Sequence, residues 1–279
     1  MTAIAPSIPL PQRHSPLSGL APLATLATRR FQLTTRTPRE LLVPLLTPIM
    51  FALVIAPALK TALHASGAYE SFVAVGTVGL LIPLNTMFAG LGVIVDRESG
   101  AQRELLAAPV PRPLLPLGNL VVALGATALQ VGVLIAAANA RGIHFAASAT
   151  GVVWFVAAAG LFAIGMYGMA ETLASRVPKQ EEYIARVPAI AILPWFLAGA
   201  LFPIGALPGF LHWVARLLPL THGLALMRYG LLGDSSGLHA IWGMSDPTAM
   251  AGLSLGVVAL FAALLTAVSI RVFTRAALR

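Results

Sequence analysis

Six apolar stretches, each close to the length that an α-helix needs to cross a lipid bilayer, are the strongest constraint on how this chain can fold. Only 10% of the residues are charged, whereas about 25% are charged in a typical soluble domain. Inside a bilayer the protein must satisfy all of its own backbone polar groups, so only α-helices and closed β-barrels can span it. The short alternating strands typical of a barrel are not evident in the sequence. The sequence therefore predicts an all-α integral membrane protein with six transmembrane helices, at residues 41–63, 70–95, 113–140, 148–172, 187–205 and 248–271.

The basic residues are concentrated in alternate segments between these stretches. If the N-terminus is cytoplasmic, only Lys60, Arg141, Arg216 and Arg228 fall on the outer side, and the other fourteen of the eighteen Lys and Arg residues fall inside. Such an excess is typical of cytoplasmic loops. We therefore expect a multi-pass protein with both termini in the cytoplasm. The same bias explains the net charge of +8, so we expect no nucleic-acid partner.

The choice of basic residue also carries information about the source. The chain has sixteen Arg and two Lys residues and is rich in Ala, Gly and Pro, a bias typical of a GC-rich bacterial genome. The expected location is therefore the bacterial plasma (inner) membrane.

The first part of the chain differs from the apolar remainder. Residues 1–18 are rich in Pro and Ser and predict a disordered cytoplasmic tail, while residues 19–279 predict a single membrane domain. Residues 19–36 place apolar side chains at helical spacing and add Arg29 and Arg30. This pattern predicts an amphipathic helix on the inner leaflet, with both arginines near anionic headgroups. An irregular tail beside the membrane is the alternative.

A second unusual region, residues 205–233, lies between the fifth and sixth stretches. It is too apolar for a solvated loop, yet it is interrupted by Pro208 and Pro219. Two short helices that dip back into the outer leaflet would explain both properties, because irregular backbone is tolerated at membrane depth where protein surrounds it. A seventh span is the alternative, but it would place the C-terminus outside and contradict the charge count.

We find no motif for catalysis or nucleotide binding. A P-loop needs G-x-x-x-x-G-K followed by Ser or Thr, and neither Lys60 nor Lys179 follows such glycines, so this chain is not expected to bind or hydrolyse ATP by that route. There is no Cys, and the six His residues are scattered, so no metal site is expected. The sequence GLSLG at 252–256 formally matches a hydrolase motif, but it lies in an apolar stretch, where Gly252 and Gly256 favour close packing between helices.

The middles of the six stretches contain no charged residue. Asn85, Asn119, Gln130 and Asn139 are polar but uncharged, and Glu171 falls at an inner helix end. A proton-coupled secondary transporter would be expected to hold an acid within the membrane, and a membrane-embedded lipid-processing enzyme would need acid–base or metal groups. Both remain alternatives, but an energy source in a partner protein is favoured.

The connector between the second and third stretches concentrates charge. Residues 96–112 hold three of the ten acids of the chain and three of its arginines. Asp96 is expected to cap a short helix whose first turn includes Glu98, since an acid is favourable at that end of a helix. Arg97, Arg103 and Glu104 would form its charged face. An ordinary solvated loop is the alternative.

The connector also resembles a known family. Asp-Arg-Glu-x-Gly, then Arg-Glu-Leu-Leu-x-x-Pro-Val-x-Arg and Leu-Gly, over residues 96–118, resemble the first cytoplasmic loop of ABC-2 type exporter permeases, and most closely the daunorubicin-resistance drug-efflux group. Residues 193–233 are similar to the signature region of that family, with Phe-Pro at 202–203, Leu-Pro at 207–208 and Leu-Met-Arg-Tyr ending at Tyr229.

This resemblance implies a type V ABC exporter fold and a set of partners. Residues 96–108 would hold a coupling helix that docks on a separate P-loop ATPase subunit, present in two copies, which binds the ATP and Mg. A second permease subunit, identical or homologous, would complete the transporter, and this chain would itself have no catalytic residue and no cofactor. The residues expected to contact the ATPase are Asp96, Arg97, Glu98, Gly100, Arg103 and Glu104.

The resemblance further implies re-entrant helices at residues 205–230, near the exit of a path for a hydrophobic or amphiphilic substrate, a drug or a lipid-like molecule. An apolar and aromatic path would suit such a substrate. The candidates to line it are Trp195, Phe196, Phe202, Phe210 and Trp213. Contact with membrane lipid at the interface is the alternative for each of these aromatics.

Overall fold

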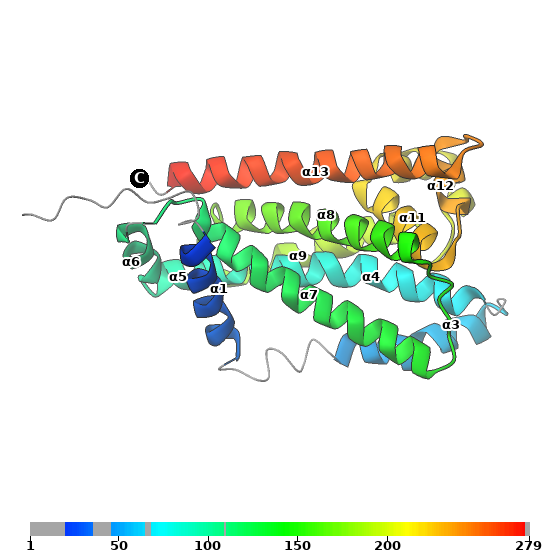
Figure 1. Cartoon of the computed structure of the whole chain (residues 1–279), viewed down its shortest axis with the longest axis horizontal. Helices are drawn as coiled ribbons and strands as arrows, with labels where there is room; N and C mark the ends of the chain where they lie inside the picture. Colours follow the sequence, from blue (N-terminus) through cyan, green and yellow to red (C-terminus); the bar gives the residue numbers. More distant parts are fainter. Residues whose placement is uncertain (1–19, 36–45, 65–67, 109, 277–279) are drawn as a thin grey trace, which may run out of the picture.

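A computed structural model describes residues 20–35, 46–64, 68–108 and 110–276 of the chain. Throughout these ranges the secondary structure is helical, without a strand. The predicted tail at residues 1–18 lies outside the described residues, as do residues 41–45 of the first predicted span. Long helices run side by side and form one bundle (Figure 1). They are α4 (Ala68–Ala89), α7 (Leu114–Ala140), α8 (Ala149–Ala174), α9 (Gln180–Leu197) and α13 (Pro247–Ala276).

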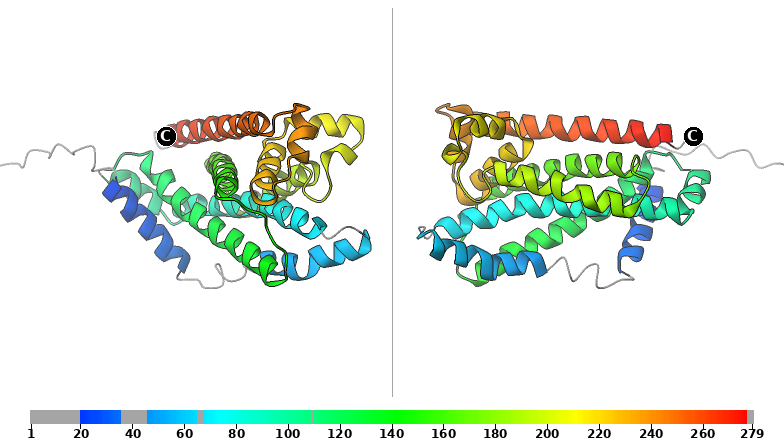
Figure 2. Two further views of the ribbon diagram at one scale, coloured as in Figure 1. Left: turned by 45° about the vertical axis from the view of Figure 1, so that its right-hand side comes forward. Right: turned by 180° about the vertical axis from the view of Figure 1, so that it is seen from behind.

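The short elements collect at the two ends of this bundle. One end, which we call the connector end, carries α5 (Leu91–Glu98) and α6 (Ala101–Ala107), and α1 (Leu20–Thr35) lies across it rather than along the bundle (Figure 1). The opposite, distal end carries the short elements between α9 and α13 (Figure 2). They are η3 (Ile204–Ala206), α10 (Gly209–Leu217), α11 (Pro219–Leu232) and α12 (Ser236–Trp242).

Four helices have the length and apolar composition needed to cross a membrane: Ala68–Glu98, Leu114–Ala140, Ala149–Ala174 and Pro247–Arg275. They coincide with the second, third, fourth and sixth predicted spans. The first predicted span corresponds to a shorter apolar helix, Leu46–Ala62, which contains the π-helical η2 (Phe51–Ile55) and α3 (Ala56–Ala62). The count of six spans therefore stays a prediction.

The helix at the fifth predicted span, 187–205, has different bounds, and the span itself stays a prediction. Its helix α9 starts at Gln180 and ends at Leu197. The start lies further back because Glu181 and Glu182 occupy the first turn, where acidic side chains are favourable. The end comes earlier because Gly199 takes a left-handed conformation, with φ of 79°, that does not continue an α-helix.

The two short helices predicted within residues 205–233 are present as α10 and α11. Pro208 immediately precedes α10, and Pro219 is the first residue of α11, where the missing N–H of proline costs nothing. With 14 residues, α11 is shorter than the roughly 20 that a span requires, so the region is not a seventh span. Whether it re-enters the membrane stays a prediction.

Helix α8 lies at the centre of the bundle and packs most extensively against α13 and α11. Small residues allow this: a Cβ at Gly165 or Gly168 would collide with α13, and a Cβ at Gly151 would collide with the backbone of Gly230 in α11. The predicted packing role of the GLSLG glycines is wrong, because a Cβ at Gly252 or Gly256 would meet no atom of the described residues within 4 Å. The close approach between α8 and α13 depends on Gly165 and Gly168 of α8.

Changing Gly168 to Ala tests this packing. The added Cβ would lie within 3 Å of the α13 backbone at Leu265, so we expect the free energy of unfolding to fall by about 1–3 kcal/mol, despite the better helix propensity of Ala. Thermal unfolding of the purified protein in detergent measures the change. Gly252→Ala is the matched control and should be neutral or slightly stabilising; an equal loss in both variants would refute the packing role of Gly168.

Candidate functional site

The charged connector forms two helices that meet at a tight corner. Helix α5 continues past Asp96 to Glu98, and Gly100, with φ of 80°, then precedes α6. The predicted capping role of Asp96 is therefore wrong: the apolar run before it extends α5, and the break comes at the Ser-Gly pair that follows, since glycine adopts a left-handed conformation without steric cost. The short helix predicted at 96–108 covers only Ala101–Ala107.

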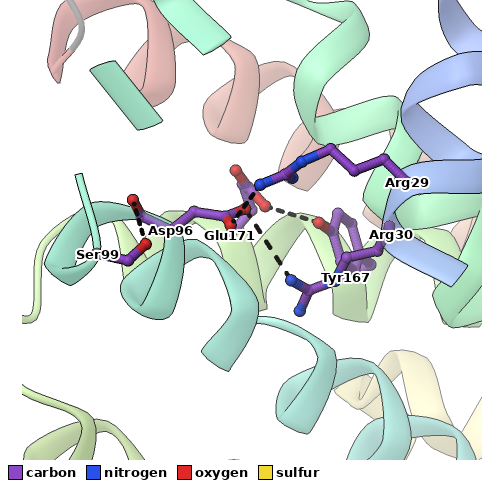
Figure 3. Close-up of polar contacts among 6 residues, drawn as sticks. All are labelled: Arg29, Arg30, Asp96, Ser99, Tyr167 and Glu171. Carbon is purple, nitrogen blue, oxygen red and sulfur yellow. Dashed lines mark hydrogen bonds and ion pairs between the residues drawn. The ribbon is translucent and has the colours of Figure 1, made fainter. Parts of the chain in front are cut away.

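Asp96 ties the connector to α1. Its side chain is buried, with the residue only 7% exposed, and its Oδ1 lies 3.1 Å from Nη2 of Arg29. Its Oδ2 lies 4.0 Å from Nη1 of Arg30 (Figure 3). Both arginines turn toward a carboxylate 66 or 67 positions away in the sequence, and their proximity to lipid headgroups stays a prediction. A charge this well buried requires such a partner.

Glu171 joins the same neighbourhood from α8. It is 1% exposed, and its Oε2 accepts a hydrogen bond of 2.8 Å from the hydroxyl of Tyr167, one helical turn earlier (Figure 3). Its Oε1 has no hydrogen-bond partner within the described part of the chain. Both carboxylates border a small recess at the connector end, together with Leu26, Arg29, Val93, Gln102, Leu105, Leu115, Pro116, Asn119 and Phe273.

Sequence reasoning did not assign Glu171 to a site. The signal available was an acid four residues after a tyrosine at the end of an apolar stretch, which indicates a polar pair on one helix face. The acid lies in the last turn of α8, so it belongs to the connector end and not to the middle of a span. In the described ranges, no three His, Asp or Glu side chains gather as a metal site.

Arg97 ties the connector to the end of α8. Its Nη1 donates to the carbonyl of Ala174 at 3.0 Å, and its Nη2 donates to the carbonyls of Val177 at 2.5 Å and Pro178 at 3.2 Å. Arginine side chains stabilise a helix C-terminus because the last carbonyls lack partners within the helix. The guanidinium therefore holds α5 against α8 and the loop after it.

Glu98 ties the connector to α9. Its Oε2 accepts a hydrogen bond of 2.7 Å from Nε2 of Gln180, the first residue of α9. Nearby, the hydroxyl of Tyr183 donates to the carbonyl of Met87 at 2.6 Å, next to the break between α4 and α5. Three consecutive residues, Asp96 to Glu98, thus bind three separate elements of the bundle.

The remaining residues of the connector turn outward. Arg103 and Glu104 on α6 are exposed, whereas Leu105 and Leu106 are half-buried, so α6 is amphipathic. Of the six residues predicted to contact a partner, Glu98, Arg103 and Glu104 present exposed surface, Asp96 is buried, Arg97 binds inward, and Gly100 forms the corner. The contact itself stays a prediction.

The five aromatics predicted to line a path do not gather at one site. Trp195 is 5% exposed, and its indole N–H donates to the carbonyl of Gly76 at 2.7 Å, so it is part of the core between α9 and α4. Phe196 stacks edge-on against Trp195 at 5.0 Å between ring centroids and is half exposed. Phe202, Phe210 and Trp213 are exposed at the distal end, and Trp213 carries Arg216 over its ring at 4.9 Å.

A buried arginine that the charge count assigned to the outer side of the membrane contacts several elements at the distal end. Arg228 of α11 lies 3.4 Å from the centroid of the Phe72 ring and donates to the carbonyl of Ala200 at 3.0 Å. The hydroxyl of Tyr69 donates to the next carbonyl, that of Leu201, at 3.0 Å. Together they supply donors to the irregular corner that follows α9, residues 198–203, which we call the distal corner.

The chain is similar to known proteins. Residues 22–232 match the profile of a protein family described as ABC-2 type transporter. A segment of 54 residues is 41% identical to "Nodulation protein J" of Rhizobium meliloti (strain 1021). That segment is 19% of this chain and spans only 21% of the length of the relative. The family match extends from α1 to the end of α11 and so includes both the connector and the distal corner.

The Arg29–Asp96 ion pair can be measured by a double-mutant cycle with Arg29→Gln and Asp96→Asn. Because the Asp96 side chain is mostly buried and that of Arg29 is 34% exposed, we expect a coupling energy of about 1 kcal/mol in the free energy of unfolding. The exposed Glu182–Arg186 pair, at 3.3 Å, is the control and should give less than about 0.5 kcal/mol. Equal coupling in the two cycles would contradict an anchoring role for Asp96.

Proposed function

The chain belongs to the ABC-2 type transporter family, and we propose that it is the permease subunit of an ATP-driven exporter that moves a hydrophobic or amphiphilic substrate outward. The observation that carries this proposal is the construction of the connector. Its outer face, on α6, is exposed and charged, while Asp96, Arg97 and Glu98 at its base bind α1, the end of α8 and the start of α9. A partner that pushes on α6 would therefore move several helices together.

The proposed partner is a P-loop ATPase subunit, present in two copies, which would supply the ATP and Mg sites. Arg103 and Glu104 on α6, together with Glu98 at the corner, offer it exposed charges of both signs. A second permease subunit, identical or homologous, would complete the pathway. The helices that would face it carry exposed apolar side chains, among them Leu193 and Phe196 of α9.

The proposed location is the plasma (inner) membrane of a bacterium, with the connector end in the cytoplasm. Basic residues of α1, the connector, the loop after α8 and the last turns of α13 all lie at that end. Lys60, Arg141 and Arg216 lie at the distal end. This separation supports the orientation because cytoplasmic ends of membrane helices are enriched in Lys and Arg. In that orientation a cytoplasmic ATPase can reach α6.

The proposed substrate class rests on the aromatics of the distal end. Phe202, Phe210 and Trp213 are exposed there, and Phe210 retains 78% of its surface. Such side chains suit the apolar part of a drug or a lipid-like molecule leaving the protein.

The double variant Glu98→Ala, Arg103→Ala tests the partner contact. Because both side chains are exposed and would meet the ATPase, we expect its association to weaken at least about tenfold, roughly 1.4 kcal/mol, with insertion into the membrane unchanged. Co-purification of the ATPase subunit with the detergent-solubilised chain, titrated to obtain a Kd, measures the change.

His239→Ala, an exposed change on α12 at the distal end, is the control and should leave association unchanged. A wild-type chain that brings down no ATPase would refute the permease assignment. A double variant that binds as tightly as the wild type would refute only the contact through Glu98 and Arg103.

A further inference from the structure

Pro178 leaves the carbonyl of Ala174, at the end of α8, without its helical hydrogen-bond donor, and Arg97 supplies a donor in its place. In a continuing helix the carbonyl of Ala174 would accept the N–H of residue 178, four positions later, but proline has no N–H. The backbone hydrogen bonds after α8 run to Glu171 and Leu173, from Ser175, Arg176 and Val177. The donor that reaches Ala174 is Nη1 of Arg97, from an element 77 residues earlier in the sequence.

The attachment made by Arg97 is buried and has several contacts. Ala174 is fully buried and Val177 nearly so, which makes an unsatisfied carbonyl there costly. The planar guanidinium meets three carbonyls at once, a geometry that the single ammonium group of a lysine cannot reproduce. The end of α8 is therefore held in a defined position by the connector.

Helix α8 links this attachment to the other end of the molecule. Its 26 residues span about 39 Å, and at the distal end Gly151 touches Gly230 of α11, backbone against backbone. Two residues before Gly230, Arg228 holds the distal corner through the carbonyl of Ala200. The contacts are continuous from Arg97 through α8 and α11 to that corner.

The two neighbours of Arg97 in the connector, Asp96 and Glu98, bind elements other than α8. Asp96 binds α1, which packs mainly against α7. Glu98 binds the exposed start of α9 through one neutral donor, Gln180. Arg97 is the member of the three that engages α8 directly.

We propose that Arg97 is a positioning residue through which a displacement of α6 enters α8, and that α8 and α11 carry this displacement to the distal corner. The inference rests on the proposed function, since the displacement comes from the ATPase. Arg97 would then contribute to the response of the distal end without touching ATP, the ATPase or the substrate.

A single reporter cysteine placed in η3, directly after the distal corner, can follow this region, because the chain contains no Cys of its own. Gly205 is exposed, and a Cβ there would meet no atom of the described residues within 4 Å, so Gly205→Cys should be tolerated. The complex with its ATPase is reconstituted in vesicles, and the rate of labelling by a membrane-impermeant maleimide is measured with and without ATP. In the Gly205→Cys chain we expect ATP to change this rate.

With Arg97→Gln added, we expect the ATP-dependent change in labelling to be at least about threefold smaller, while the ATPase still co-purifies. Arg271→Gln removes an exposed arginine of α13 at the same end and should leave the change intact. A full response in the Arg97→Gln chain overturns the inference. A reporter chain with native Arg97 that binds no ATPase overturns the proposed function, and this inference with it.

A further variant separates positioning from simple stabilisation of α8. Arg97→Gln with Pro178→Ala returns an N–H at position 178, which can satisfy the end of the helix without linking it to the connector. We expect this chain to regain thermal stability but not the ATP-dependent change in labelling. Recovery of both would show that Arg97 only stabilises the helix end, and would overturn the inference.

Discussion

The structure depends on finding hydrogen-bond donors for the backbone carbonyls at helix ends, which have no donor within their own helix. Where packing buries such a carbonyl, it needs another donor, since water cannot reach it. At the connector end the guanidinium of Arg97 supplies it to the last carbonyls of α8. At the distal end Arg228 and Tyr69 supply it to the corner that follows α9. Cationic and phenolic side chains thus supply donors to backbone carbonyls where the helices end inside the protein.

The connector uses charge in two different ways. Asp96 and Arg97 point into the bundle, where the ion pair to Arg29 and the bonds to α8 are partly buried and therefore less screened by water than surface charges are. Arg103 and Glu104 on α6 point outward, where charges interact weakly with one another but remain free to meet a partner. A short helix with a firmly held base and a free charged face is well suited to transmit force between two proteins.

Features that depend on neighbouring residues could be predicted from the sequence, whereas contacts between distant elements could not. Apolar periodicity and length identified the long helices, and the prolines located α10 and α11, because these are local properties of the backbone. The cap assigned to Asp96 and the packing role assigned to Gly252 and Gly256 were wrong, because short motifs do not show which face of a helix meets a neighbour. Glu171 and Arg228 were not recognised as site residues, since their importance comes from burial by other elements.

The sequence by itself determined the class of the protein, the segments available to cross a membrane, the clustering of basic residues toward one end and the position of the charged connector. Composition and spacing are sufficient for these because they depend on the solvent and on neighbouring residues. Only the tertiary structure decided which element each charged residue binds: Asp96 finds Arg29 67 positions away, and Arg97 finds Ala174 77 positions away. Such pairs form where packing brings helix ends together, and no local pattern in the chain records which ends will meet.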